Sequence, residues 1–161
     1  MTNSLKGLAP LVDERARILI LGSFPSEASL AAQQYYAHPQ NHFWRILGAV
    51  IERPLVEMDY AARQAAVKEA GIAIWDVYRG CRREGSLDAD IRGAEPNDFA
   101  RLRKIAPHLA RACFNGKTAG RFAPRLAALG FETVVLPSTS PAYTLGFAAK
   151  LEAWREALLR G

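Results

Sequence analysis

Residues 16–26 read ARILILGSFPS, a strand-like run that stops abruptly at a turn of small residues. Ala16–Leu21 is expected to form a strand, and its continuous apolar core predicts that both faces of that strand are buried. The turn Gly22–Ser26 follows at once, at the carboxyl end of the strand. Open α/β sheets bind their ligands at that end. The segment therefore predicts an α/β fold with a ligand site beside the turn.

A second segment, YYAHPQNHFW at residues 35–44, gathers aromatic rings and a carboxamide. Such a set suits a flat heterocycle, because a ring such as Tyr36 can stack on it. The amide of Asn41 can hydrogen-bond an edge of the heterocycle or hold a water molecule. Rings packed in the core around an internally bonded Asn41 would give the same pattern, so both interpretations stay open at this point.

Strands and helices alternate along the rest of the chain. Further strands are expected at 72–77, 111–114 and 132–136, and helices at 41–51, 60–70, 98–106, 118–129 and 145–159. Gly71 and Gly130 are expected to end two of these helices. Residues 78–96 are expected to form a long Gly- and Arg-rich loop, either functional or disordered.

This alternation predicts the fold class α/β: a three-layer α/β/α sandwich around a central, mostly parallel four-stranded sheet. The strand order stays open. A chain of 161 residues can bury a substantial core. Because no repeat, linker or low-complexity tract interrupts it, residues 1–161 are expected to form a single domain.

The charge of the chain is compatible with a polyanionic partner. The net charge is +5 and the pI is near 9.5, although basic proteins with other partners are common. The cationic residues cluster at Arg79, Arg82, Arg83 and Arg92 and then at Arg101, Arg103 and Lys104. Such a cluster forms either an anion-binding surface or an ordinary solvated face.

Membrane and metal functions are not expected. No apolar run approaches the roughly 20 residues that cross a bilayer, and Met1–Lys6 lacks the apolar core of a signal peptide. Cys81 and Cys113 lie far apart and are expected to be reduced thiols of a cytoplasmic protein. The three histidines, His38, His42 and His108, form no metal-binding pattern, so no metal is expected.

Three strand ends carry polar segments that should meet in one crevice. Gly22–Ser26 follows the first strand, Asn115-Gly116 the third, and Pro137–Pro141 the fourth. Loops after parallel strands share one edge of the sheet. The Ser-Thr-Ser of the last loop offers hydroxyl and backbone N–H groups to an anion such as a phosphate. Capping of the following helix is the alternative role for these side chains.

Taken together, these segments resemble the uracil-DNA glycosylase superfamily, and most closely its hypoxanthine-DNA (deoxyinosine) glycosylase branch, a relative of the mismatch-specific uracil/thymine glycosylases. The resemblance rests on motifs in order along nearly the whole chain: GSFPS (22–26), YYAHPQNHFW (35–44), IWDV (74–77), GSLD (85–88), FNGK (114–117) and LPSTSP (136–141). It implies a monofunctional enzyme that flips a deaminated base out of DNA and hydrolyses its N-glycosidic bond. It also implies no cofactor and no lyase activity, and a monomer is expected.

The chain departs from the family pattern at two places. The mismatch-specific relatives carry a water-orienting Asn where this chain has Phe24, and the resemblance assigns that catalytic role to Asn41 instead. It also implies base binding by Gly22, Ser23, Phe24, Tyr36 and Asn115. The second departure is Ala142-Tyr143-Thr144, where Ala-Asn-Ala would be expected.

The loop after the fourth strand is expected to contact DNA through Ser138, Thr139, Ser140, Pro141 and Tyr143. Tyr143 would press into the gap that the flipped base leaves, as apolar wedges do. Packing beneath the final helix is the alternative for Tyr143. Lys117 and Lys150 are interpreted as phosphate contacts or surface residues.

Two carboxylates, Asp76 and Asp88, accompany these motifs, and they either assist catalysis or serve as caps and partners of the loop arginines. The sequence also leaves the substrate open. Uracil or xanthine could replace hypoxanthine, the enzyme could hydrolyse free nucleosides, and the chain could be a non-catalytic DNA-binding module.

Overall fold

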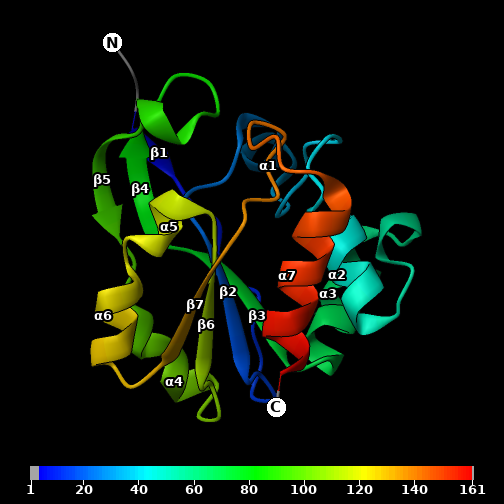
Figure 1. Cartoon of the computed structure of the whole chain (residues 1–161). Coiled ribbons are helices and arrows are strands. Elements are labelled where there is room, and N and C mark those ends of the chain that lie inside the picture. Colours follow the sequence, from blue (N-terminus) through cyan, green and yellow to red (C-terminus); the bar gives the residue numbers. More distant parts are fainter. Residues whose placement is uncertain (1–3, 161) are drawn as a thin grey trace.

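A computed structural model describes residues 4–160. Residues 1–3 of the Met1–Lys6 segment and Gly161 of the expected domain lie outside the described residues. The central sheet has four parallel strands in the order β3-β2-β6-β7 (Figure 1). Their bounds are Ile72–Asp76 for β3, Ile18–Gly22 for β2, Arg111–Asn115 for β6 and Glu132–Leu136 for β7. The expected sheet is confirmed, and its order is now fixed.

The register of the sheet brings the strand ends together. Gly22 is paired with Asp76, and Asn115 with Leu136. Leu19, Ile20 and Leu21 of β2 are fully buried, as the central position of this strand requires. The polar residues that follow the four strands therefore emerge along one edge of the sheet.

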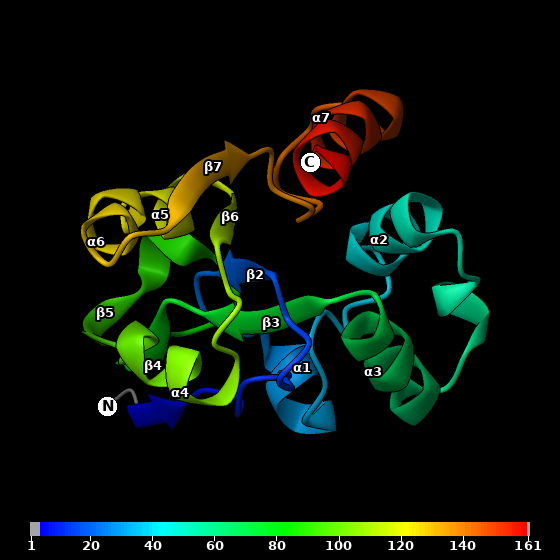
Figure 2. The same ribbon diagram turned by 90° about the horizontal axis from the view of Figure 1, so that it is seen from below.

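Helices cover both faces of the sheet. The helices are α1 Glu27–Ala32, α2 Phe43–Ile51, α3 Tyr60–Glu69, α4 Leu102–Ile105, α5 Lys117–Gly120, α6 Ala123–Ala128 and α7 Phe147–Leu159. Short 3₁₀ turns occupy Leu55–Glu57, Asp88–Asp90 and Phe99–Arg101. Figure 2 shows α2, α3 and α7 on one side of the sheet and α4, α5 and α6 on the other. The three-layer α/β/α arrangement is confirmed.

The expected loop at 78–96 is instead largely a second sheet. Strands β4 (Tyr78–Arg82) and β5 (Arg92–Pro96) are antiparallel, and β1 (Ser4–Lys6) joins them in the order β1-β4-β5. Short strands rich in Gly and Arg lack the alternation and β-branched content that mark a strand in sequence. Pairing between segments distant along the chain supplies the order that local propensity does not.

The expected helix at 118–129 is two helices, α5 and α6. Pro124 lies in the first turn of α6, where its missing N–H is harmless. In a continuous helix its ring would clash with the carbonyl of Gly120 and remove a hydrogen bond. Helix α1 was not anticipated, although Ser26 caps it by accepting from the N–H of Ser29 at 3.1 Å.

Gly71 and Gly130 follow α3 and α6 with φ of +75° and +93°, as expected for residues that end helices. Cys81 and Cys113 are buried free thiols on β4 and β6. Among residues 4–160, none of the helices combines the length and the apolar character needed to span a bilayer.

Helix α7 holds the loop that follows β7. Lys150 is 1% exposed, and its Nζ donates to the carbonyls of Ser140 and Tyr143 at 3.3 and 2.9 Å. The indole of Trp154 donates to the carbonyl of Pro137 at 2.9 Å. The interpretation of Lys150 as a phosphate contact or surface residue is therefore wrong, since this ammonium is committed to main-chain acceptors inside the protein.

Replacing Lys150 by Met should loosen this loop. The change leaves part-buried carbonyl oxygens without their donor, so we expect the free energy of unfolding to fall by about 1 kcal/mol. Amide hydrogen exchange at Tyr143, whose N–H donates to the carbonyl of Ser140 at 3.1 Å, should become faster. The exposed Lys117 provides the control, and Lys117→Met should change neither measurement. Unaltered exchange at Tyr143 in Lys150→Met would show that α7 does not hold the loop.

Candidate active site

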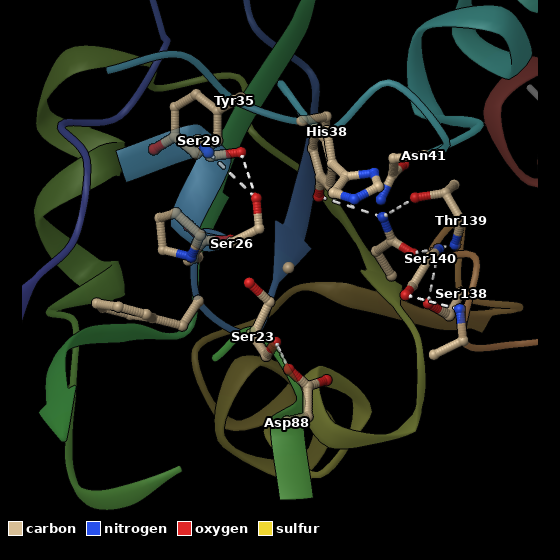
Figure 3. Close-up of a pocket in the computed structure, with 18 of the residues that line it drawn as sticks. Ser23, Ser26, Ser29, Tyr35, His38, Asn41, Asp88, Ser138, Thr139 and Ser140 are labelled. Carbon is tan, nitrogen blue, oxygen red and sulfur yellow. Dashed lines mark hydrogen bonds between the residues drawn. The ribbon is translucent and has the colours of Figure 1, made fainter. Parts of the chain in front are cut away.

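A cavity of about 280 Å³ opens at the carboxyl ends of the parallel strands. Its volume lies just below the range of roughly 300–1,000 Å³ typical of drug-sized ligands, so it suits a small ligand. Its lining includes the predicted site residues Gly22, Ser23, Phe24, Tyr36, Asn41, Asn115, Ser138, Thr139, Ser140 and Tyr143. Pro141 is exposed and is not part of the lining. Figure 3 shows Ser23 and Ser26 on one side and Asn41, Thr139 and Ser140 on the other.

Gly22 makes room for two polar groups at the floor of the cavity. A Cβ at this position would lie 2.6 Å from Oδ1 of Asp76 and 2.9 Å from the hydroxyl of Tyr36. Both distances are shorter than side chains tolerate. The carbonyls of Gly22 and Ser23 accept from the N–H groups of Val77 and Tyr78 at 2.8 and 3.1 Å, which fixes the path of the turn.

Tyr36 is held on two sides. Its ring stacks on Phe43, with centroids 3.8 Å apart and planes 16° from parallel. Its hydroxyl accepts from Nδ2 of Asn115 at 3.2 Å. The backbone has a φ of +53°, a left-handed conformation uncommon for a residue with a side chain. Burial, followed by the charge of Asp76, raises the pKa of Tyr36 above its ordinary range, so the phenol stays neutral.

Asn115 joins Tyr36 to the loop after β7. Its Nδ2 also donates to Oγ1 of Thr139 at 2.9 Å, and its Oδ1 accepts from the N–H of Thr139 at 2.9 Å. Thr139 is fully buried. The N–H and Oγ1 of Thr139 are thus bonded inside the protein, so contact of Thr139 with DNA stays a prediction that rests on its hydroxyl proton. Direct base binding by Asn115 stays a prediction.

Asn41 belongs to a tight turn at the start of α2. Its Oδ1 accepts from the N–H of Phe43 at 2.9 Å, and its own N–H donates to the carbonyl of His38 at 3.0 Å. The N–H of His42 donates to the carbonyl of Thr139 at 3.1 Å, which ties this turn to the loop after β7. Asn41 therefore has a structural bond as well as a place in the cavity wall.

Ser29 fixes the segment that carries Tyr36, a role that sequence reasoning missed. Its Oγ accepts from Oγ of Ser26 at 3.0 Å and from the N–H of Ala37 at 3.1 Å. The signal available in the sequence was the Ser-x-x-Ser spacing of residues 26–29, which is typical of a helix start. His38 and Ser86 also line the cavity and were not singled out.

The loop at 138–143 is ordered by its own hydroxyl groups. Oγ of Ser138 accepts from the N–H of Ser140 at 3.1 Å, and Oγ of Ser140 accepts from the N–H of Ala142 at 3.2 Å. The N–H groups of Thr139 and Ser140, which were expected to bind an anion, are thus already used, and α7 begins only at Phe147. What Ser138 and Ser140 keep free for a phosphate are their hydroxyl protons.

Tyr143 projects from this loop at the cavity mouth. It is 43% exposed and so is not a core residue, although its ring centroid lies 5.5 Å from Nζ of Lys150 on the final helix. Phe24, in contrast, is 7% exposed, and the guanidinium of Arg83 lies 5.2 Å from its ring centroid. One wall of the cavity is therefore apolar and rigid, while the opposite loop presents an aromatic ring to solvent.

Two carboxyl groups line the cavity near the turn. Asp88 accepts from Oγ of Ser23 at 2.6 Å, while Asp76 is 5% exposed. Burial, then the charge of Asp88, raises the pKa of Asp76 to about 7, and Arg83 acts in the opposite direction. Within residues 4–160, no ion pair joins either carboxylate to a loop arginine, contrary to that alternative.

Comparisons with known proteins agree with this geometry. The family model of the uracil DNA glycosylase superfamily matches residues 9–159. A relative from Methanosarcina barkeri named hypoxanthine DNA glycosylase is 41% identical over 155 residues, covering 96% of this chain and 98% of the relative. A relative of the same name from Methanosarcina acetivorans is 43% identical, with the same coverage.

A solved structure is similar over almost its full length. It is the solution NMR structure of a Methanosarcina acetivorans protein provisionally described as a uracil DNA glycosylase. Its TM-score with this chain is 0.88 at 40% identity, covering 97% of both chains. The resemblance carried by the motifs is thereby confirmed, and the chain belongs to the uracil DNA glycosylase superfamily.

Proposed function

We propose that this protein is a monofunctional DNA glycosylase that removes deaminated bases, hypoxanthine first among them, for base excision repair. The observation that carries the proposal is the cavity at the strand ends, where an aromatic ring, an amide and a hydroxyl-bearing loop converge in a chain of this superfamily. The names of the two relatives support hypoxanthine as the preferred base.

The substrate must leave the duplex before it can be bound. A flipped base costs a few kcal/mol of unstacking, and stacking in the pocket returns part of this. Tyr36 has one face packed on Phe43 and lines the cavity, so its ring is a rigid platform for the base. Stacking of a base on an aromatic side chain is worth about 1–3 kcal/mol.

Bond cleavage then needs stabilisation of charge and a positioned water. The bond between C1′ and the base nitrogen breaks with its electron pair leaving on the base. The N–H groups around Gly22–Phe24 would stabilise that anion, since the carbonyls of Gly22 and Ser23 are turned to the next segment. Asn41 would hold the water that bonds to C1′, and the surplus proton of the water leaves to solvent.

The remaining parts of the proposal concern context. The hydroxyls of Ser138 and Ser140 would donate to a phosphate beside the flipped nucleotide, and exposed Pro141 lies on the same loop. None of these steps calls for a metal or an organic cofactor. We take the enzyme to be a cytoplasmic monomer with the whole chain as one domain.

Incubation with oligonucleotides tests the function. Duplexes containing a single deoxyinosine, deoxyuridine or deoxyxanthosine should yield alkali-labile sites, with deoxyinosine cleaved fastest. Breaks that appear without alkali would contradict the absence of lyase activity. Hydrolysis of free inosine without action on DNA would indicate a nucleosidase, and binding without breaks would indicate a DNA-binding module.

Asn41→Ala should slow excision by roughly 10²–10³-fold, the loss seen when one preorganised catalytic group is removed. The structure calls for a matched control, because Ala also removes the turn bond to Phe43. Ser can make this bond, more weakly, so Asn41→Ser should stay folded but be similarly slow under single-turnover conditions. Normal excision by Asn41→Ser would reduce Asn41 to a structural amide.

Tyr36→Phe keeps the stacking ring and loses only the acceptor for Asn115. We expect excision within a few-fold of wild type, whereas Tyr36→Ala should lose about 1–3 kcal/mol of base binding, roughly 5- to 150-fold. Single-turnover rates over a range of enzyme concentrations separate this loss of binding from a slower chemical step. Equal damage in both variants would assign the hydroxyl a direct role.

Tyr143→Ala should distinguish duplex from single-stranded substrate. A wedge is needed only where a base stack must be held open, so we expect a large loss of excision on duplex DNA and a much smaller one on single strands. Because Tyr143 is exposed, the thermal stability of the Tyr143→Ala variant should match that of the wild type. Equal losses on the two substrates in a stable protein would rule out the wedge.

A further inference from the structure

Asp76 is a cavity residue with a buried carboxyl oxygen that has no hydrogen-bond partner among the described residues. It ends β3, lines the cavity and is 5% exposed. The oxygen without a partner is Oδ2. The other buried side-chain atoms in this condition belong to His42, Arg83, Arg103 and Arg111, which do not line the cavity. An unsatisfied buried carboxyl in a native protein needs an explanation.

Neighbouring polar groups are already engaged with one another. Asn115 uses its amide on Tyr36 and Thr139. Asp88 accepts from Ser23. Among these polar groups at the floor of the cavity, the carboxyl of Asp76 is thus left without a hydrogen bond from a side chain of residues 4–160.

The surroundings of Asp76 also disfavour its ionised form. The charges around it come from Asp88 in the Asp88–Asp90 turn and from Arg83 after β4, and the phenols of Tyr35 and Tyr36 are its other titratable neighbours. The charge of Arg83 lowers the pKa of Asp76, but less than burial and Asp88 raise it. The guanidinium of Arg83 donates to the carbonyls of Pro25 and Gly85 at 2.5 and 2.8 Å instead of forming an ion pair with Asp76. Burial and the charge of Asp88 raise the pKa of Asp76 to about 7. Near neutral pH much of the population therefore carries a proton on this carboxyl.

A protonated carboxyl matches the group that deamination introduces. Deamination replaces an exocyclic amino group by a carbonyl beside a ring N–H, in hypoxanthine, uracil and xanthine alike. We propose that Asp76 is a base-contacting catalytic residue whose protonated carboxyl donates a hydrogen bond to this carbonyl. The inference rests on the proposed glycosylase function and deepens it.

This contact would act mainly in the transition state. As the glycosidic bond breaks, its electron pair spreads over the departing base and negative charge grows on the carbonyl oxygen. A hydrogen bond donated to that oxygen becomes charge-assisted and strengthens. The proton stays on Asp76 throughout. An ionised Asp76 would instead repel the departing base, so the rate should depend on the protonation of this side chain.

The test is the pH dependence of single-turnover excision of hypoxanthine from duplex DNA at saturating enzyme. Wild-type excision should fall as the pH rises above about 7, approaching tenfold per unit, because the protonated form is the active one. Asp76→Asn keeps a donor that cannot titrate. It should excise within about tenfold of wild type near pH 6 and lack this fall, while Asp76→Ala should lose roughly 10²-fold.

Asp88→Asn is the matched control that tests whether the pH dependence of excision arises from Asp76. It removes the negative charge beside Asp76 and can still accept from Ser23, so ionisation of Asp76 becomes easier. The fall in the wild-type profile should therefore move to lower pH in this variant. An unmoved profile would contradict the assignment of the titration to Asp76.

Thermal unfolding provides a readout independent of activity. The pKa of Asp76 is raised in the folded state, so folding binds a proton between the ordinary carboxyl range and about pH 7. The wild type should thus lose stability relative to Asp76→Asn as the pH rises through this window, and the difference should level off above it. A constant difference between the two proteins would show that Asp76 is ionised throughout.

Two results would overturn the inference while leaving the glycosylase function intact. Parallel profiles for wild type and Asp76→Asn would assign the titration to another group. An Asp76→Asn variant as slow as Asp76→Ala near neutral pH would show that the carboxylate, and not a donor, is required. Absence of excision by the wild type at every pH would instead refute the proposed function itself.

Discussion

The side-chain amide of Asn115 holds together the two walls of the cavity. It lies at the end of β6 in the middle of the sheet edge, donates to Tyr36 and Thr139, and accepts from the N–H of Thr139. Thr139 in turn accepts from the N–H of His42, beside Asn41. Segments from three distant parts of the chain are thus fixed by one buried group. Such a network is stable only if every member is satisfied, which leaves Asn115 little freedom for another role.

Asp76 presents the opposite situation two strands away along the same edge. Its neighbour Gly22 lacks the side chain that would collide with it, and among residues 4–160 no cation forms an ion pair with it, so the buried Arg83 offsets its charge only in part. An unpaired carboxylate is costly in such a place, which raises the pKa of Asp76 to about 7. The edge of the sheet therefore combines two different groups. The amide of Asn115 is fully hydrogen-bonded within the protein, whereas the carboxyl of Asp76 has a hydrogen-bonding oxygen without a partner in the described part of the chain. Perturbed acids of this kind are frequent at functional sites.

The sequence predicted the features that depend on local pattern and missed those that depend on tertiary contacts. Apolar runs such as Ile18–Leu21 predicted the parallel strands, and the rule for strand ends predicted where the cavity forms. Pro124 could have revealed the break between α5 and α6. The burial of Lys150 could not be foreseen, because its acceptors lie on a loop whose path only the fold determines. The second sheet was missed since β1 is three residues long and pairs with a distant strand.

This chain has Phe24 where the mismatch-specific relatives carry a water-orienting Asn, and this difference affects the whole site. Phe24 is buried beneath Arg83, which is itself tied to the carbonyls of Pro25 and Gly85, so the turn after β2 has become a rigid apolar wall. A polar group that orients water must then come from elsewhere. Asn41 lies across the cavity from Ser23 of this turn (Figure 3), and its Oδ1 is already aligned by the N–H of Phe43. A side chain preorganised in this way loses little entropy when it binds water, which offsets the loss of the amide at position 24. The water would then approach from the side of α2, and the turn after β2 would be left to bind the base.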